Sequence, residues 1–133
     1  MDAHPTRRSG RARLLGVLMA VCGAALAAPV ELDADVMRAI EDSNKSLASN
    51  IALKDVKAST GDARDLAQMF TQVEAHFAAK ADAVDATTLA RKSHDLALGI
   101  VESVNGNDFA GATDAATTLS RTCRTCHTFY KKS

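Results

Sequence analysis

The chain has 133 residues, of which 47% are apolar and 24% charged, and its formal net charge is zero. That length is enough for one domain, and the composition excludes both a disordered tail and a bundle of membrane helices. Because the sequence is rich in alanine and has no proline from residue 30 to residue 133, it favours helices and argues against an all-β fold.

Residues 1–27 have the pattern of a cleaved signal peptide. Four arginines between residues 7 and 13 precede an apolar run, residues 14–27, that is too short for a stable membrane helix. Small residues occupy the two positions that a signal peptidase reads before Ala28. We therefore expect residues 28–133 to be the mature domain and the bacterial periplasm to be its location. A retained N-terminal anchor and a lipoprotein acylated at Cys22 are weaker alternatives.

Removal of the signal peptide changes the charge balance. It takes away four arginines and one aspartate, so the mature chain has 12 basic and 15 acidic residues and a net charge of −3. Binding to nucleic acid needs a clustered positive face. We therefore expect no nucleic acid partner.

The mature chain begins with three helical segments. The first helix is expected over Asp33–Leu53, where apolar residues recur in steps of four and seven. Residues 59–62 have the composition of a turn with capping residues, and a second helix is expected after them, to about Lys80. A third helix is expected to begin with Asp82 as its cap and to end at Asn105-Gly106.

The fourth helix is expected to open at Asn107 or Asp108 and carries a regular apolar stripe. Its inward positions alternate in steps of three and four, which is the heptad spacing of packed helices. These positions are Phe109, Ala112, Ala116, Leu119, Cys123, Cys126 and Tyr130. The two cysteines therefore belong to the buried side of this helix.

Four helices with short connections predict an all-α fold, an antiparallel up-down-up-down four-helix bundle. In this topology the end of the fourth helix lies level with the start of the first, the end of the second and the start of the third. Met37, His76, Phe77 and Leu89 are then able to approach a group bound there, whereas Met69 lies about two turns deeper.

Cys123, Cys126 and His127 form a Cys-x-x-Cys-His motif. This spacing is the attachment signature of c-type haem, in which two thioether bonds form to the vinyl groups and the histidine ligates iron. On a helix the three residues fall on one face, so both sulfurs and the imidazole can address the same macrocycle.

Three other interpretations of the motif compete with haem. A structural zinc site needs four ligands, and a second Cys/His pair at ligand spacing is missing. A thioredoxin-like dithiol belongs at the start of a helix after a strand, and the sequence has no βαβ pattern. A disulfide would leave His127 unexplained and would close a loop too short to stabilise the fold.

The motif lies near the C-terminus of an exported four-helix chain, with Tyr130 three residues and Lys131 four residues after the histidine. In this it resembles the class II c-type cytochromes, the cytochrome c′ group. The resemblance covers residues 119–132 in detail and the whole mature chain in architecture. It implies one covalent haem c near the C-terminal end of the fourth helix, periplasmic redox proteins as partners, and homodimers as a common state.

The resemblance also bears on the residues around the haem. In the cytochrome c′ group the start of the first helix supplies either a sixth ligand, usually methionine, or a blocking apolar residue, and Met37 lies near that position. The group's basic residues pair with the haem propionates, and Arg38 and Lys131 are the candidates here. From the sequence, the sixth ligand stays open between Met37, His76 and none.

The sequence therefore predicts a periplasmic carrier of single electrons. It predicts no enzyme, because it contains no nucleophile triad, no Gly-rich phosphate loop and no distal acid–base pair. The alternative is a five-coordinate haem protein that binds NO or CO behind an apolar wall formed by Ile40, Phe77 and their neighbours. Haem contacts are also expected for Leu89 and Tyr130.

Overall fold

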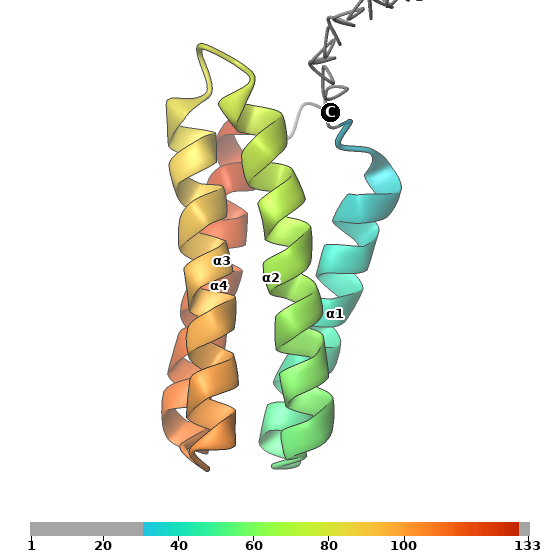
Figure 1. Ribbon diagram of the computed structural model, residues 1–133, viewed down its shortest axis with the longest axis vertical. Helices are drawn as coiled ribbons and strands as arrows, with labels where there is room; N and C mark the ends of the chain where they lie inside the picture. Colours follow the sequence, from blue (N-terminus) through green and yellow to red (C-terminus); the bar gives the residue numbers. More distant parts are fainter. Residues whose placement is uncertain (1–30, 131–133) are drawn as a thin grey trace, which may run out of the picture.

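The structure, a computed structural model, describes residues 31–130 of the chain. These residues form four helices and no strand, and each helix runs antiparallel to the one before it (Figure 1). The helices are α1 (Ala34–Ala52), α2 (Val56–Ala78), α3 (Val84–Asn105) and α4 (Phe109–Tyr130). The predicted four-helix bundle is confirmed, while the predicted signal peptide and Lys131 lie outside the described residues.

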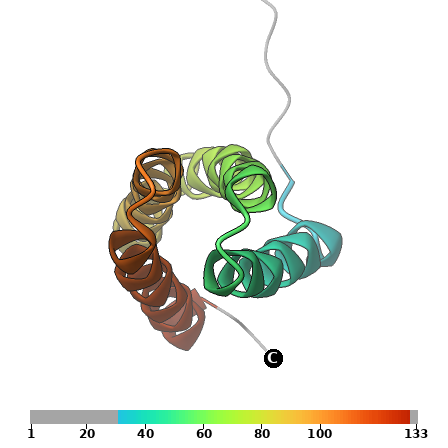
Figure 2. The ribbon, with the colours of Figure 1, turned by 90° about the horizontal axis from the view of Figure 1, so that it is seen from below.

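Consecutive helices pack against each other, and α1 also contacts α4, which completes the bundle. The interface between α1 and α4 is the least extensive of the four. Viewed along the bundle, these two helices diverge with distance from the α1–α2 and α3–α4 connections (Figure 2). Within residues 31–130, no helix is both long enough and apolar enough to cross a membrane.

The start of α1 agrees with the sequence prediction. The side chain of Asp33 accepts a hydrogen bond from the backbone N–H of Val36 at 2.8 Å, which is the geometry of a helix N-cap. The buried residues of α1 are Ile40, Leu47 and Ile51. Because they recur in steps of seven and four, they form one stripe that faces the other helices.

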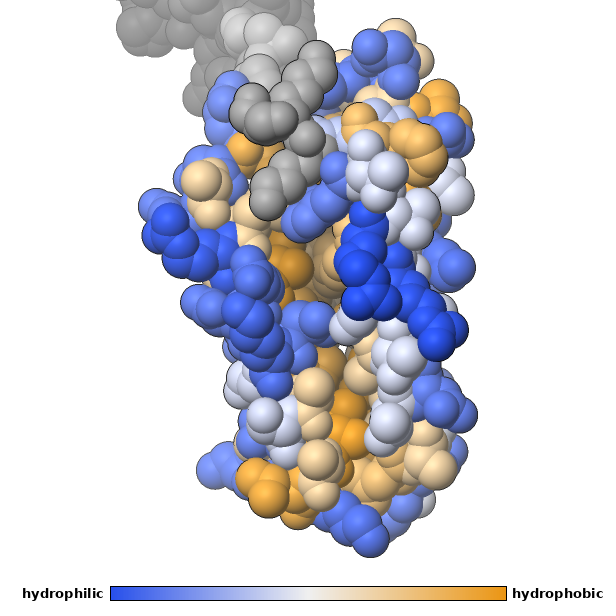
Figure 3. Space-filling view, turned by 180° about the vertical axis from the view of Figure 1, so that it is seen from behind, coloured by the Kyte–Doolittle hydropathy of each residue, from blue (hydrophilic) through white to orange (hydrophobic). Residues whose placement is uncertain are grey.

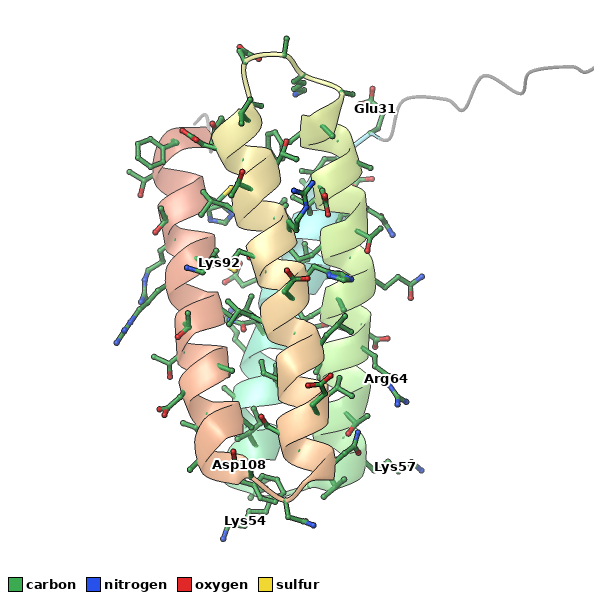
Figure 4. The ribbon with its side chains drawn as sticks, turned by 60° about the vertical axis from the view of Figure 1, so that its left-hand side comes forward. Glu31, Lys54, Lys57, Arg64, Lys92 and Asp108 are labelled. Atoms are coloured by element: carbon green, nitrogen blue, oxygen red, sulfur yellow. The ribbon has the colours of Figure 1, made fainter. Side chains whose placement is uncertain are left out.

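Two connections of the same design join α1 to α2 and α3 to α4. In each, a residue with left-handed backbone follows the helix end, Lys54 (φ 57°) or Asn107 (φ 59°). The next residue is Asp55 in one connection and Asp108 in the other. Its backbone N–H donates to a carbonyl of the preceding helix, and its side chain caps the following helix. Both connections lie at one end of the bundle, where Figure 4 shows Lys54 and Asp108. We call this end the closed end.

The turn predicted at residues 59–62 is wrong. Asp55 accepts a hydrogen bond from the backbone N–H of Ala58 at 2.9 Å and caps α2, which therefore begins at Val56. The residues of the predicted turn lie inside the first turns of α2. Their capping chemistry is not used there because the cap has already been supplied upstream.

The cap predicted for α3 is also wrong. Ala83 occupies the N-cap position and makes no side-chain cap hydrogen bond. The connection continues one residue past Asp82, because the backbone N–H of Ala83 donates to the carbonyl of Lys80 at 3.2 Å. For α4, the sequence left Asn107 and Asp108 as possible first residues. The side chain of Asp108 accepts a hydrogen bond from the backbone N–H of Gly111 at 2.9 Å, so Asp108 is the cap.

The hydrophobic core is fully buried in the middle of the bundle and only partly buried at its ends. The largest fully buried apolar side chains are Leu47, Leu66, Ile100, Val104 and Leu119. Away from the closed end, toward the end that carries Cys123 and Cys126 and that we call the cysteine end, apolar side chains of the core are only half-buried: Leu32, Val36, Met37, Phe77 and Cys123. Hydrophobic surface shows between the polar flanks of α1 and α4 (Figure 3). At the cysteine end, residues 31–130 thus leave part of this apolar surface exposed.

Candidate haem-binding site

The Cys-x-x-Cys-His motif lies within the last turns of α4. Cys123 and Cys126 are free thiols and half-buried, whereas His127 is exposed. At about 100° of rotation per residue, the three residues span about 100° of the helix circumference. Cys123 packs against the core cluster. The two sulfurs and the imidazole therefore lie next to one another on one face of α4, at the cysteine end.

Burial keeps both thiols protonated at neutral pH. Burial raises the pKa of Cys123 to about 11 from its usual 9.0, and the neighbouring Cys126 contributes a smaller part of this increase. Burial also raises the pKa of Cys126. A redox dithiol or a thiolate ligand of zinc needs an environment that lowers the thiol pKa. The environment of this pair has the opposite effect.

Within residues 31–130, no group of three or more His, Cys, Asp or Glu side chains is arranged to hold a metal ion. Haem iron takes one or two ligands from the protein, because the porphyrin supplies the other four. A haem site therefore needs a single well-placed imidazole and an apolar surface rather than a cluster of ligands.

A hydrogen bond across the bundle fixes which residue of α1 is level with the motif. The Asn44 side chain of α1 donates to the Ser120 hydroxyl of α4 at 3.0 Å. Met37 precedes Asn44 by seven residues and His127 follows Ser120 by seven, so each lies two turns, about 10 Å, along an antiparallel helix on nearly the same side. Met37 and His127 are consequently level with each other, and both belong to the sides of α1 and α4 that meet.

Another side of α1 faces α2, the helix that carries the second candidate ligand, His76. The Asn50 side chain donates to the Asp62 carboxylate at 2.8 Å. His76 follows Asp62 by fourteen residues and Val36 precedes Asn50 by fourteen, so His76 is level with Val36 at the α1–α2 interface. Its ring meets the Phe77 ring edge-on, with centroids 5.1 Å apart. The structure therefore separates Met37, on the α4 side of α1, from His76, on the α2 side.

Phe77 and Tyr130 meet at the cysteine end from opposite helices. Their ring centroids lie 5.4 Å apart, which joins the end of α2 to the end of α4 as the topology predicts. Ile40 is buried in α1, and Leu89 is half-buried in α3. The buried side chains of α3 at this end are small, namely Ala86, Ala90 and Ser93. The buried α3 side chains at this end are thus small, whereas the half-buried apolar side chains of α1 and α2 at this end are larger.

Of the two basic residues predicted for the haem propionates, the structure describes only Arg38. Arg38 is exposed and pairs with the Asp35 carboxylate at 3.2 Å, one turn away on α1, and Lys131 lies outside the described residues. One other lysine lies at this end: the Lys80 ammonium is 5.6 Å from the centroid of the Phe77 ring. Sequence reasoning did not single it out, because no spacing marks it. Figure 4 shows Lys92 on the side of α3 next to α4.

Two hollows open on the surface away from the motif. One follows the α3–α4 interface and is lined by Thr88, Arg91, Lys92, Asp95, Leu96, Gly99, Ser103 and Ala115. A smaller one, of about 120 Å³, lies between α1 and α4 below Ser120 and is lined mainly by small and polar residues. Neither contains a cysteine or a histidine.

The chain matches no protein-family model, and neither curated proteins nor solved structures include a significant match to it.

Proposed function

We propose that the protein is a periplasmic c-type cytochrome that carries single electrons, with one covalent haem. The observation that carries the proposal is the placement of Cys123, Cys126 and His127 together on one face of α4, at an end where apolar side chains of the core are only half-buried. A spacing that is required for attachment, and an apolar surface that a macrocycle would cover, occur at the same place. The resemblance to the cytochrome c′ group supports the same conclusion.

Each residue of the motif has a separate role in this proposal. Cys123 and Cys126 attach the group through thioether bonds, and His127 provides one axial nitrogen. The exposed second ring nitrogen of His127 is available to hydrogen-bond outward, which would tune the ligand strength of the first. When bound, the haem supplies the one-electron chemistry of its iron, and the protein contributes axial ligation, burial and the surrounding charge.

Met37 is the sixth ligand in this proposal. It is level with His127, lies on the side of α1 that meets α4, and is a half-buried thioether with core contacts. Thioether ligation opposite histidine favours the reduced state and raises the potential. It also fills the coordination position that a diatomic gas would need. The position of His76 on the other side of α1 is the reason for preferring Met37 to it.

The gas-binding alternative rests on a specific observation. Ile40, Phe77 and Met37 form an apolar rather than a polar distal environment, and Met37 is only half-buried. If Met37 did not reach the iron, the same site would be a five-coordinate haem that binds NO or CO.

The test is expression with the haem-attachment machinery, followed by extraction of the purified protein in acid acetone. We expect the colour to stay with the polypeptide, and Cys123→Ala combined with Cys126→Ala to abolish it. His127→Gly should lose the native spectrum and regain part of it when imidazole is added. Colour that passes into the solvent, or a native spectrum in His127→Gly, would overturn the proposal.

A further inference from the structure

A polar contact joins α1 to α4 two turns from the level of Met37 and His127. Asn44 donates to Ser120 at 3.0 Å across this interface, and the pair is partly buried. The residues next to it are small or polar, among them Ala48, Ala116 and Thr117, and they leave a hollow of about 120 Å³. The hydrogen bond is therefore a specific element of a loosely filled interface.

Burial along α1 decreases toward its start. Leu47 and Ile51, toward the closed end from Asn44, are buried, and so is Ile40 on the other side of Asn44. Val36 and Met37, one turn nearer the cysteine end, are only half-buried, and α1 diverges from α4 in that direction (Figure 2). The first turn of α1, which carries Met37, is thus less covered by the bundle than the rest of the helix.

We infer that Asn44 and Ser120 are positioning residues for Met37: their hydrogen bond sets the register of α1 against α4 and so controls how often Met37 occupies the distal axial position. A slip of α1 by one residue would move Met37 by about 1.5 Å and turn it by about 100°, away from α4. The inference rests on the proposed function. It adds that the Asn44–Ser120 hydrogen bond, two helical turns from Met37, controls the access of external ligands to the distal side.

The expected size of the effect follows from the contact. A partly buried neutral hydrogen bond changes an equilibrium constant by about fivefold. Loss of the bond should therefore raise the fraction of protein with Met37 dissociated by about fivefold. Because an external ligand binds only this fraction, its apparent association rate should rise by the same factor.

The test compares haem-loaded Asn44→Ala and Ser120→Ala with a matched control, Asn50→Ala. Asn50 is also an asparagine of α1, but its bond to Asp62, at 2.8 Å, joins α1 to α2. We expect CO to bind the reduced Asn44→Ala and Ser120→Ala proteins about fivefold faster than the wild type. The double variant should be no faster than either single variant, because both lose the same bond. Ser120→Thr, which keeps the hydroxyl, should restore the wild-type rate.

A second measurement does not require haem. Backbone amides in the half of α1 before Asn44 should exchange hydrogen faster in Asn44→Ala than in Asn50→Ala. Unchanged CO binding and exchange in Asn44→Ala, or equal increases in Asn50→Ala, would overturn the inference. So would a wild-type protein that binds CO as fast as Met37→Ala. A protein without haem would refute the proposed function instead, and the exchange comparison would still decide whether the bond holds α1 in place.

Discussion

Replacing a methionine with alanine can distinguish a haem ligand from a residue that only packs in the core, because the chain has two methionines in similar surroundings. Met37 and Met69 are both half-buried and both pack against the same core cluster. Truncation of a fully buried methionine to alanine costs about 2–5 kcal/mol, so half-burial places each variant at about 1–2 kcal/mol. In a domain of this size that cost lowers the melting temperature by about 5–10 °C. The haem-free proteins should therefore lose similar stability.

The haem-loaded proteins should differ. Met37→Ala should lose the weak absorption band near the red end of the oxidised spectrum and bind CO rapidly when reduced, because the distal position is vacated. Met69→Ala and His76→Ala should keep the wild-type band and slow CO binding. The assays are optical spectroscopy of both oxidation states, CO mixing kinetics, and thermal unfolding with and without haem. A band that survives in Met37→Ala but disappears in His76→Ala would refute the ligand assignment. If CO binds fast to the wild type, the gas-binding alternative applies.

Two further predictions concern the protein without haem. Because the folded state holds the pKa of Cys123 at about 11 against its usual 9.0, the unfolded chain loses this proton first. Stability should fall by at most about 2–3 kcal/mol as the pH rises from about 9 to about 11. Urea unfolding at these pH values checks this, and Cys123→Ser should flatten the slope; an unchanged slope would contradict it. Lys54→Gly should raise stability by about 1 kcal/mol, since Lys54 has a left-handed backbone. Asn107→Gly should gain less, because asparagine tolerates that conformation; equal gains in thermal unfolding would show this reasoning wrong.

The helices could be predicted from the sequence because their signals are local. Each apolar stripe recurs with the helical period, and Asp33 and Asp108 cap the helices that follow them. The predicted turn at residues 59–62 failed for a local reason too. A residue in left-handed conformation, Lys54, ends α1 without glycine, so the true connection had no recognisable signal.

The position of the candidate site along the bundle axis could also be predicted, but the side of α1 that faces α4 could not. Antiparallel topology alone brings the start of α1 to the end of α4, which is why Met37 and His76 were both candidates. Which side of α1 faces α4 depends on contacts such as Asn44 with Ser120, separated by 76 residues in the chain. No local pattern encodes such a pair. The same limit explains Arg38, whose nearest partner is a carboxylate on its own helix.

The placement of both short connections at the closed end has a consequence for the order of folding. Each joins two helices through three residues, so contacts beside it require little loss of chain entropy. Early contacts should therefore gather around Leu47, Leu66 and Val104, and the remaining turns should dock progressively away from them. The cysteines lie at the far end of the last helix to be synthesised. They are thus among the last side chains to pack, which, in the proposed cytochrome, would leave the chain time to receive haem before the bundle is complete.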